Sequence, residues 1–129
     1  MAAQRAFISF DFDHDADLRV LLAGQARNAD TPFEFANWSV KEPMVGDWRE
    51  KVRTRIRATD FTIVLCGEHT HTASGVTAEL LITREERKPY FLLWGRPDKT
   101  CTKPSSALPT DKTYKWTWDN LKALINGAR

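Results

Sequence analysis

The chain has 129 residues, of which 42% are hydrophobic and 11% aromatic, and a chain of this length is expected to form one domain that buries roughly two-thirds of its unfolded surface. We therefore expect a single domain over residues 1–129. The 19 basic and 17 acidic side chains leave a formal charge of +2, which is too balanced for a protein that binds nucleic acid through counterion release. The longest apolar runs, 61–66 and 90–94, fall far short of the roughly 20 residues of a membrane span, and the first residues lack the apolar core of a signal peptide. These features predict a cytoplasmic protein without a nucleic-acid or membrane partner.

The first third of the chain predicts a strand, a helix, a second strand and a loop. Residues 5–10 are largely apolar, have no helical period and precede an acidic residue, which indicates a short buried strand. Asp15 is a residue type that caps helices, and the helix after it would present one face made of Leu18, Leu21, Leu22 and Gln25. Residues 33–36 alternate between apolar and polar, as a short edge strand does. Residues 37–46 have no period and predict a loop that is long enough to be functional.

The middle of the chain predicts a helix, a strand and a further helix. Asp47 can cap the first of these helices, whose apolar face would consist of Trp48, Val52, Ile56 and Thr59. Residues 61–66 form the clearest strand in the sequence, and Gly67 marks its end. Ser74 can cap the next helix, which would run to about Arg87.

The last third predicts two strands and a final helix. Residues 90–94 read as a buried strand, and residues 95–112 are rich in Pro, Ser and Thr and predict irregular chain. Residues 114–116 can supply a fifth strand. Thr117 is expected to cap the last helix, which Gly127 would end.

The alternation of strands and helices predicts an α/β fold. Central strands that are apolar throughout indicate a doubly wound, mostly parallel five-stranded sheet with helices on both faces. Ligands of such sheets bind beyond the carboxyl ends of the strands. The segments to examine for function are therefore 11–15, 37–47, 67–74 and the chain from residue 95 onward.

Glu79 is the best-placed ionisable residue, because it lies within the first two turns of the helix that follows the central strand. A carboxylate there could bind ribose hydroxyls and stabilise an oxocarbenium-like centre while a glycosidic bond breaks. The alternative is an ordinary solvated glutamate that is favoured by the helix dipole. From position alone, the solvated glutamate is the preferred interpretation.

The acidic residues after the first strand have two interpretations. Asp11, Asp13 and Asp15, with His14 among them, could bind Mg²⁺ as in phosphoryl-accepting receiver domains. However, a receiver needs an acceptor aspartate at the end of the third strand, and that strand ends in Leu65-Cys66-Gly67. Helix capping by Asp15 is the preferred interpretation, while Asp11 could still contact a bound ribose.

Other known kinds of site are absent from the sequence. His69 and His71 lack a further ligand at metal-binding spacing, so we expect no metal site. No GxGxxG motif and no P-loop occur, which excludes the usual dinucleotide-dehydrogenase and NTPase fingerprints. The two cysteines form neither a disulfide framework nor a ligand pair, and Cys66 reads as a core residue rather than a nucleophile.

Two tryptophans bracket the loop after the second predicted strand. Trp38 and Trp48 could stack on adenine or nicotinamide rings. The alternative for Trp48 is a place in the apolar stripe of its own helix, and that interpretation is preferred. Trp38 is the more available of the two.

Four segments resemble the TIR-like domain family, especially the short TIR-like proteins of Thoeris antiphage systems. These segments are 5–11 with its Ile-Ser-Phe end, 37–48, 58–70, and 74–80, which ends in Glu79-Leu80. The resemblance implies a flavodoxin-like fold. Many members cleave NAD⁺ at the nicotinamide glycosidic bond with one glutamate in the helix after the third strand, which by the motif is Glu79 here.

The resemblance also implies a set of residues around the bound nucleotide. They are Phe10, Asp11, Trp38, Trp48, Cys66, Gly67 and Ser74. One departure from the pattern occurs: many relatives have a tryptophan four residues before the glutamate, where this chain has Gly75. The loss of that ring would change how the pocket shields its cation from water, which bears on rate and product.

The first functional hypothesis is therefore an NAD⁺-cleaving enzyme that needs no cofactor or metal, because NAD⁺ is the substrate. It would release nicotinamide and make a cyclic ADP-ribose-type signal, or ADP-ribose if water captures the cation. The resemblance further implies self-association for activity and a separate effector protein that responds to the product. The second hypothesis is a non-catalytic TIR-like interaction module, and the third is a flavin- or nucleotide-binding receptor without turnover.

Overall fold

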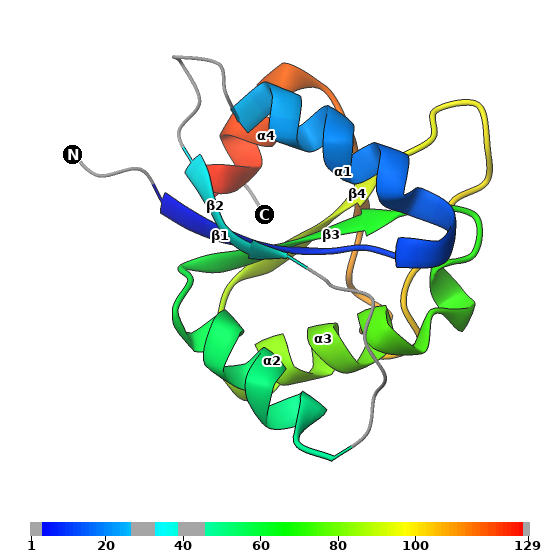
Figure 1. The fold of residues 1–129 in the computed structure, drawn as a ribbon. Helices are drawn as coiled ribbons and strands as arrows, with labels where there is room; N and C mark the ends of the chain where they lie inside the picture. Colours follow the sequence, from blue (N-terminus) through cyan, green and yellow to red (C-terminus); the bar gives the residue numbers. More distant parts are fainter. Residues whose placement is uncertain (1–3, 27–32, 39–45, 128–129) are drawn as a thin grey trace.

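The computed structural model describes residues 4–26, 33–38 and 46–127, with the side chains of 26 and 33–38 left out of the description. The elements in chain order are β1 Gln4–Ser9, α1 Phe12–Ala26, β2 Phe33–Trp38, α2 Trp48–Arg57, β3 Phe61–Cys66, the 3₁₀ helix η1 Thr70–Thr72, α3 Ser74–Glu85, β4 Tyr90–Trp94, β5 Thr113–Lys115 and α4 Trp118–Ile125 (Figure 1). Strands and helices alternate along most of the chain, as the sequence predicts.

The five strands form one sheet in the order β2-β1-β3-β4-β5, and every neighbouring pair is parallel. Ile8 lies beside Ile63, which in turn lies beside Phe91. The predicted α/β fold with a parallel five-stranded sheet is confirmed. The chain leaves β1 for β2 on one side and later returns to its other side with β3, so the strand order reverses at β1. In doubly wound sheets this reversal creates the crevice in which ligands bind.

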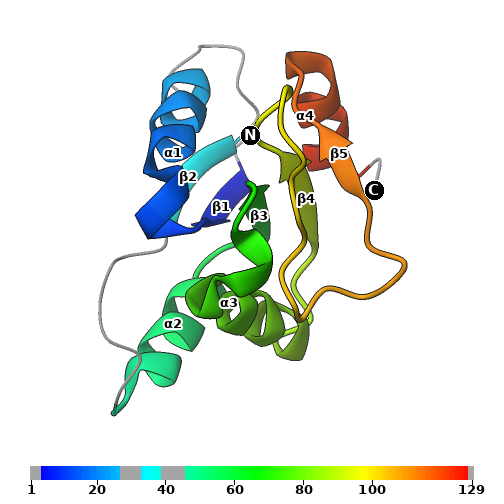
Figure 2. The same ribbon diagram turned by 90° about the vertical axis from the view of Figure 1, so that its right-hand side faces the viewer.

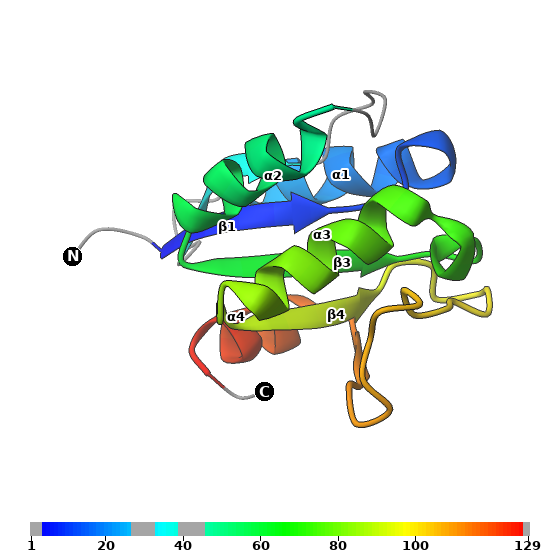
Figure 3. The ribbon, with the colours of Figure 1, turned by 90° about the horizontal axis from the view of Figure 1, so that it is seen from below.

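Helices cover both faces of the sheet, with α1 and α4 on one face and α2 and α3 on the other (Figures 1 and 3). Side chains alternate between the faces along each strand. Ile8 and Ile63 accordingly belong to the core under α1 and α4, whereas Phe7 and Val64 belong to the core under α2 and α3. Among the described residues, no helix combines the length and the apolar character that crossing a membrane would require.

The start of α1 differs from the prediction. The helix begins at Phe12 rather than after Asp15, and Asp15 itself interrupts it with the non-helical angles φ −124° and ψ 20°. The backbone oxygen of Asp11 accepts bonds from the amides of His14 and Asp15, so Asp11 starts the helix. The predicted apolar face is also too wide, because Leu21 is 60% exposed.

Two other caps differ from expectation, and one is as predicted. Ala73, not Ser74, occupies the N-cap of α3, and no side chain caps that end. Asp47 is the N-cap of α2, but its side chain forms no capping bond. Thr117 caps α4 and accepts a bond from the amide of Asn120, as predicted.

Several boundaries shift by a few residues. β2 extends to Trp38, two residues beyond the predicted edge strand, and β5 covers 113–115 instead of 114–116. α3 ends at Glu85, a little before the expected end. Most of the predicted functional loop, residues 39–45, lies outside the described residues.

Candidate functional site

Glu79 points into the protein from α3 toward β1. Its side chain is only 3% exposed, and Oε1 accepts a hydrogen bond of 2.7 Å from the hydroxyl of Ser9, which is fully buried. Ser9 is the last residue of β1. A buried carboxylate requires such donors to offset its lost hydration. The bond therefore holds the Glu79 carboxylate at the carboxyl end of the strand where the sheet order reverses.

Two threonines fix the turn of α3 that carries Glu79. The hydroxyl of Thr83 donates to the backbone oxygen of Glu79 at 2.8 Å, and the hydroxyls of Thr83 and Thr62 lie 3.1 Å apart. Both threonines are buried. Because Thr62 belongs to β3, these bonds set how α3 lies on the sheet and hence where the carboxylate of Glu79 sits.

The segment after β1 brings Phe10 and Asp11 close to Ser9. Both are buried, and the Phe10 ring stacks on that of Phe12. One oxygen of the Asp11 carboxylate lies 2.7 Å from Nδ1 of His14, and the other accepts a bond from the amide of residue 13. Asp11 thus caps its own helix, which is the role that the sequence suggested for Asp15, and it remains next to the end of β1.

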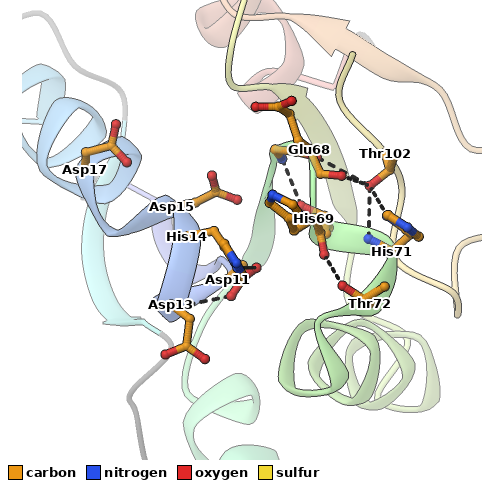
Figure 4. Close-up of polar contacts among 12 residues, drawn as sticks. Asp11, Asp13, His14, Asp15, Asp17, Glu68, His69, His71, Thr72 and Thr102 are labelled. Carbon is orange, nitrogen blue, oxygen red and sulfur yellow. Dashed lines mark hydrogen bonds and ion pairs between the residues drawn. The ribbon is translucent and has the colours of Figure 1, made fainter. Parts of the chain in front are cut away.

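The rings of His14 and His69 stack on each other across the carboxyl ends of β1 and β3, with centroids 4.2 Å apart (Figure 4). This contact joins the start of α1 to the connection between β3 and α3. In the described ranges, no group of three or more His, Cys, Asp or Glu side chains is arranged to hold a metal ion.

Asp15 is buried against Gly67, and Arg96 pairs with it. The carboxylate is 1% exposed and accepts bonds from Nη2 and Nε of Arg96 at 3.0 and 3.2 Å. Burial raises the pKa of the Asp15 carboxyl, and the bond and charge of Arg96 oppose that rise. A Cβ atom built on Gly67 would lie 2.3 Å from Oδ2 of Asp15. Gly67 is therefore required here because the carboxylate of Asp15 fills the space that a side chain would take.

The remaining predicted site residues are dispersed. Cys66 is fully buried, and burial raises the pKa of its thiol, which keeps the sulfur protonated. Trp48 is 5% exposed and packs with Val52 in the core between the sheet and α2. Trp38 is the last residue of β2, and its side chain is not among those described. Ser74 is exposed and lines a cavity of about 380 Å³ beside α3, and Glu79 is not among the residues that line it.

Gly75, which replaces the tryptophan of many relatives, lies in the first turn of α3. A Cβ atom added there would meet nothing within 4 Å. There is space on this side of the helix for a larger side chain, so the glycine is not required by packing against the described residues.

Comparison with known proteins gives the family. A family model described as the TIR-like domain of the Thoeris protein ThsB matches residues 7–99. No curated protein matches. Seven chains of solved structures match; one, the crystal structure of a prokaryotic SEFIR domain, is 19% identical, covers 96% of this chain and 91% of its own, and superposes with a TM-score of 0.56. This likeness supports the fold, and because the family model spans most of the chain, the protein belongs to the Thoeris ThsB TIR-like domain family.

Proposed function

We propose that this protein cleaves NAD⁺ at the bond between nicotinamide and ribose, with Glu79 as the catalytic residue. The bonding electron pair leaves with nicotinamide, and positive charge develops on the ribose ring. A carboxylate held beside that ring stabilises the charge as it forms. The observation that carries the proposal is the buried bond between Ser9 and Glu79, which fixes a carboxylate at the sheet's switch point in a member of a TIR-like family.

The buried position of Glu79 suits this reaction. Charge interactions are strongest where water is excluded, and a carboxylate held by the Ser9 hydroxyl needs no reorganisation when the ribosyl cation appears. Capture of the cation by a hydroxyl or ring nitrogen of the same molecule gives a cyclic ADP-ribose-type product and releases a proton. Capture by water gives ADP-ribose and a proton.

The wider role follows from the family. We propose a Thoeris-like antiphage function, in which the product activates a separate effector protein and the enzyme becomes active on self-association. NAD⁺ is consumed as a substrate, and the residues that line the site need no cofactor or metal for this chemistry.

A second candidate is a non-catalytic interaction module. Two neighbouring apolar side chains on α1 favour it, because Val20 is 65% exposed and Leu21 is 60% exposed. Contiguous exposed apolar patches mark protein-interaction sites, and two adjacent exposed side chains would contribute to such a patch. Under this alternative Glu79 would serve only to anchor α3 to β1 through Ser9.

Incubation of concentrated protein with NAD⁺, followed by chromatography and mass spectrometry, tests the proposal. We expect nicotinamide in equal amount to the ADP-ribose-type product, and H₂¹⁸O distinguishes water capture, which labels the product, from cyclisation, which does not. The same measurement on lysates of phage-infected cells tests whether infection is needed to activate the protein. If nicotinamide is released under neither condition, the proposal is wrong.

Antiphage protection by the Glu79→Gln variant separates the two candidates. The substitution keeps the shape and the acceptor for Ser9 but removes the charge. An enzyme loses protection, whereas an interaction module keeps it. Glu85→Gln is the matched control, because Glu85 lies on the same helix with an exposed side chain.

A further inference from the structure

A second cavity lies at the carboxyl ends of β4 and β5, two neighbouring strands at one edge of the sheet (Figure 2). It has a volume of about 280 Å³ and is lined by Trp94, Pro97, Thr113, Lys115 and Trp116. Trp94 and Lys115 are the last residues of these parallel strands and pair directly in register. Their side chains therefore lie on the same face of the sheet, as does that of Thr113, two residues before Lys115.

Both indole N–H groups are engaged outside the cavity. Nε1 of Trp94 donates to the backbone oxygen of Arg96, and Nε1 of Trp116 donates to Oε1 of Gln25, each at 2.8 Å. These bonds orient the two rings before any ligand arrives. Because the polar atom of each indole is already satisfied, the rings present carbon surface to the cavity.

Among the described residues that line the cavity, Lys115 is the one with a charge. It is exposed, and its ammonium group forms no hydrogen bond or ion pair with any residue in the described ranges. None of the lining residues that the structure describes carries a carboxylate. A ligand that binds against the tryptophan rings would therefore meet a positive charge that no described residue pairs.

We propose that this cavity binds a small ligand made of a planar heteroaromatic ring with an anionic substituent, the chemical class of a nucleoside monophosphate. Ligand sites are typically concave, mostly apolar and provided with a few polar groups that set orientation. Tryptophan rings that are held in place can stack on a planar heteroaromatic ring of any kind, and the Lys115 ammonium pairs with the anionic group. Pro97 and Thr113 complete the walls.

The cavity is separate from the proposed catalytic site. Glu79 contacts β1, whereas the cavity lies at β4 and β5, with β3 between. At about 4.8 Å between neighbouring strands, the two places are on the order of 10–15 Å apart. The proposal does not depend on NAD⁺ cleavage, and each can fail without the other.

Isothermal titration calorimetry of the full chain with AMP tests the inference. We expect saturable binding of one AMP, weaker binding of adenosine, which lacks the anion, and still weaker binding of ribose 5-phosphate, which lacks the ring. Lys115→Glu should weaken AMP binding at least about tenfold, since it replaces an attraction by a repulsion. Lys112→Glu is the charge-matched control, because Lys112 is exposed and lines a different cavity.

A further variant locates the ligand. Trp116→Leu should abolish most of the AMP affinity, with circular dichroism to verify that the variant is folded. The inference is overturned if wild-type protein shows no saturable AMP binding at millimolar concentrations, or if Lys115→Glu binds AMP as well as Lys112→Glu does.

Discussion

The contact between Gly67 and Asp15 gives the sharpest prediction about stability. In Gly67→Ala, the new Cβ would lie 2.3 Å from Oδ2 and 2.4 Å from Oδ1 of Asp15, where real Cβ atoms essentially never approach within 3.0 Å. The carboxylate must therefore move by at least about 0.7 Å. It is buried and held by Arg96, so this movement strains the core or breaks the ion pair.

The cost of Gly67→Ala follows from these two effects. Overfilling a packed site costs about 1–3 kcal/mol, and a weakened buried ion pair adds to that. Because Arg96 is partly exposed and also bonds Asp17, we expect a total near 3 kcal/mol rather than the larger values of fully buried pairs. For a chain of this length that corresponds to a melting temperature lower by about 10 °C.

Urea unfolding monitored by circular dichroism measures the loss in free energy of unfolding caused by Gly67→Ala. A double-mutant cycle with Asp15→Ala identifies the origin of that loss. With the carboxylate removed, Gly67→Ala should cost less than about 0.5 kcal/mol, which gives a coupling energy of about 2.5 kcal/mol. If the two substitutions are additive, the clash with Asp15 is not the reason for glycine at this position. In that case, the close approach of a nucleotide that the family resemblance implies becomes the better explanation of Gly67.

Three further predictions concern other contacts. Ser9→Ala should lower both NAD⁺ cleavage and stability, the latter by about 1–3 kcal/mol because the buried carboxylate of Glu79 loses a donor; unchanged turnover in the folded variant would show that the hydroxyl does not position the catalytic group. Arg57 and Arg53 lower the pKa of Glu86 to about 2 from 4.5, so the stability that this glutamate contributes is present above about pH 4.5 and is lost as the pH falls toward 2. The difference in free energy of unfolding between wild type and Glu86→Gln should therefore shrink over that range, and a constant difference would contradict the assignment. Thr117→Ala removes the side-chain cap of α4 and should cost about 1 kcal/mol, whereas Ser74→Ala should cost much less because Ser74 is not a cap.

The sequence was informative about the fold because the strands carry unambiguous patterns. The run from Phe61 to Cys66 is buried at every position, so its apolar character alone predicts a central strand. Capping was less predictable, because residue type does not say which group a side chain will bond. Asp15 is a good capping residue by type, yet its carboxylate pairs with Arg96, which lies 81 residues away in the chain.

The contacts that define the candidate site could not be predicted from local patterns. Ser9 and Glu79 are 70 residues apart and meet only because β1 lies next to β3 and α3 covers both. The motif identified Glu79 as a candidate, but nothing in its sequence neighbourhood indicated its partner. Trp94 and Trp116 line the same cavity, and this could be deduced only after the order of β4 and β5 in the sheet was known.

The charge of Glu79 is the central claim about function, and the rate of nicotinamide release by Glu79→Gln measures its effect most directly. Under conditions in which wild type and Glu85→Gln cleave NAD⁺ equally, we predict a rate for Glu79→Gln that is at least about 100-fold lower, with an unchanged circular dichroism spectrum and melting temperature. A folded Glu79→Gln variant that releases nicotinamide within about twofold of the wild-type rate would contradict the account.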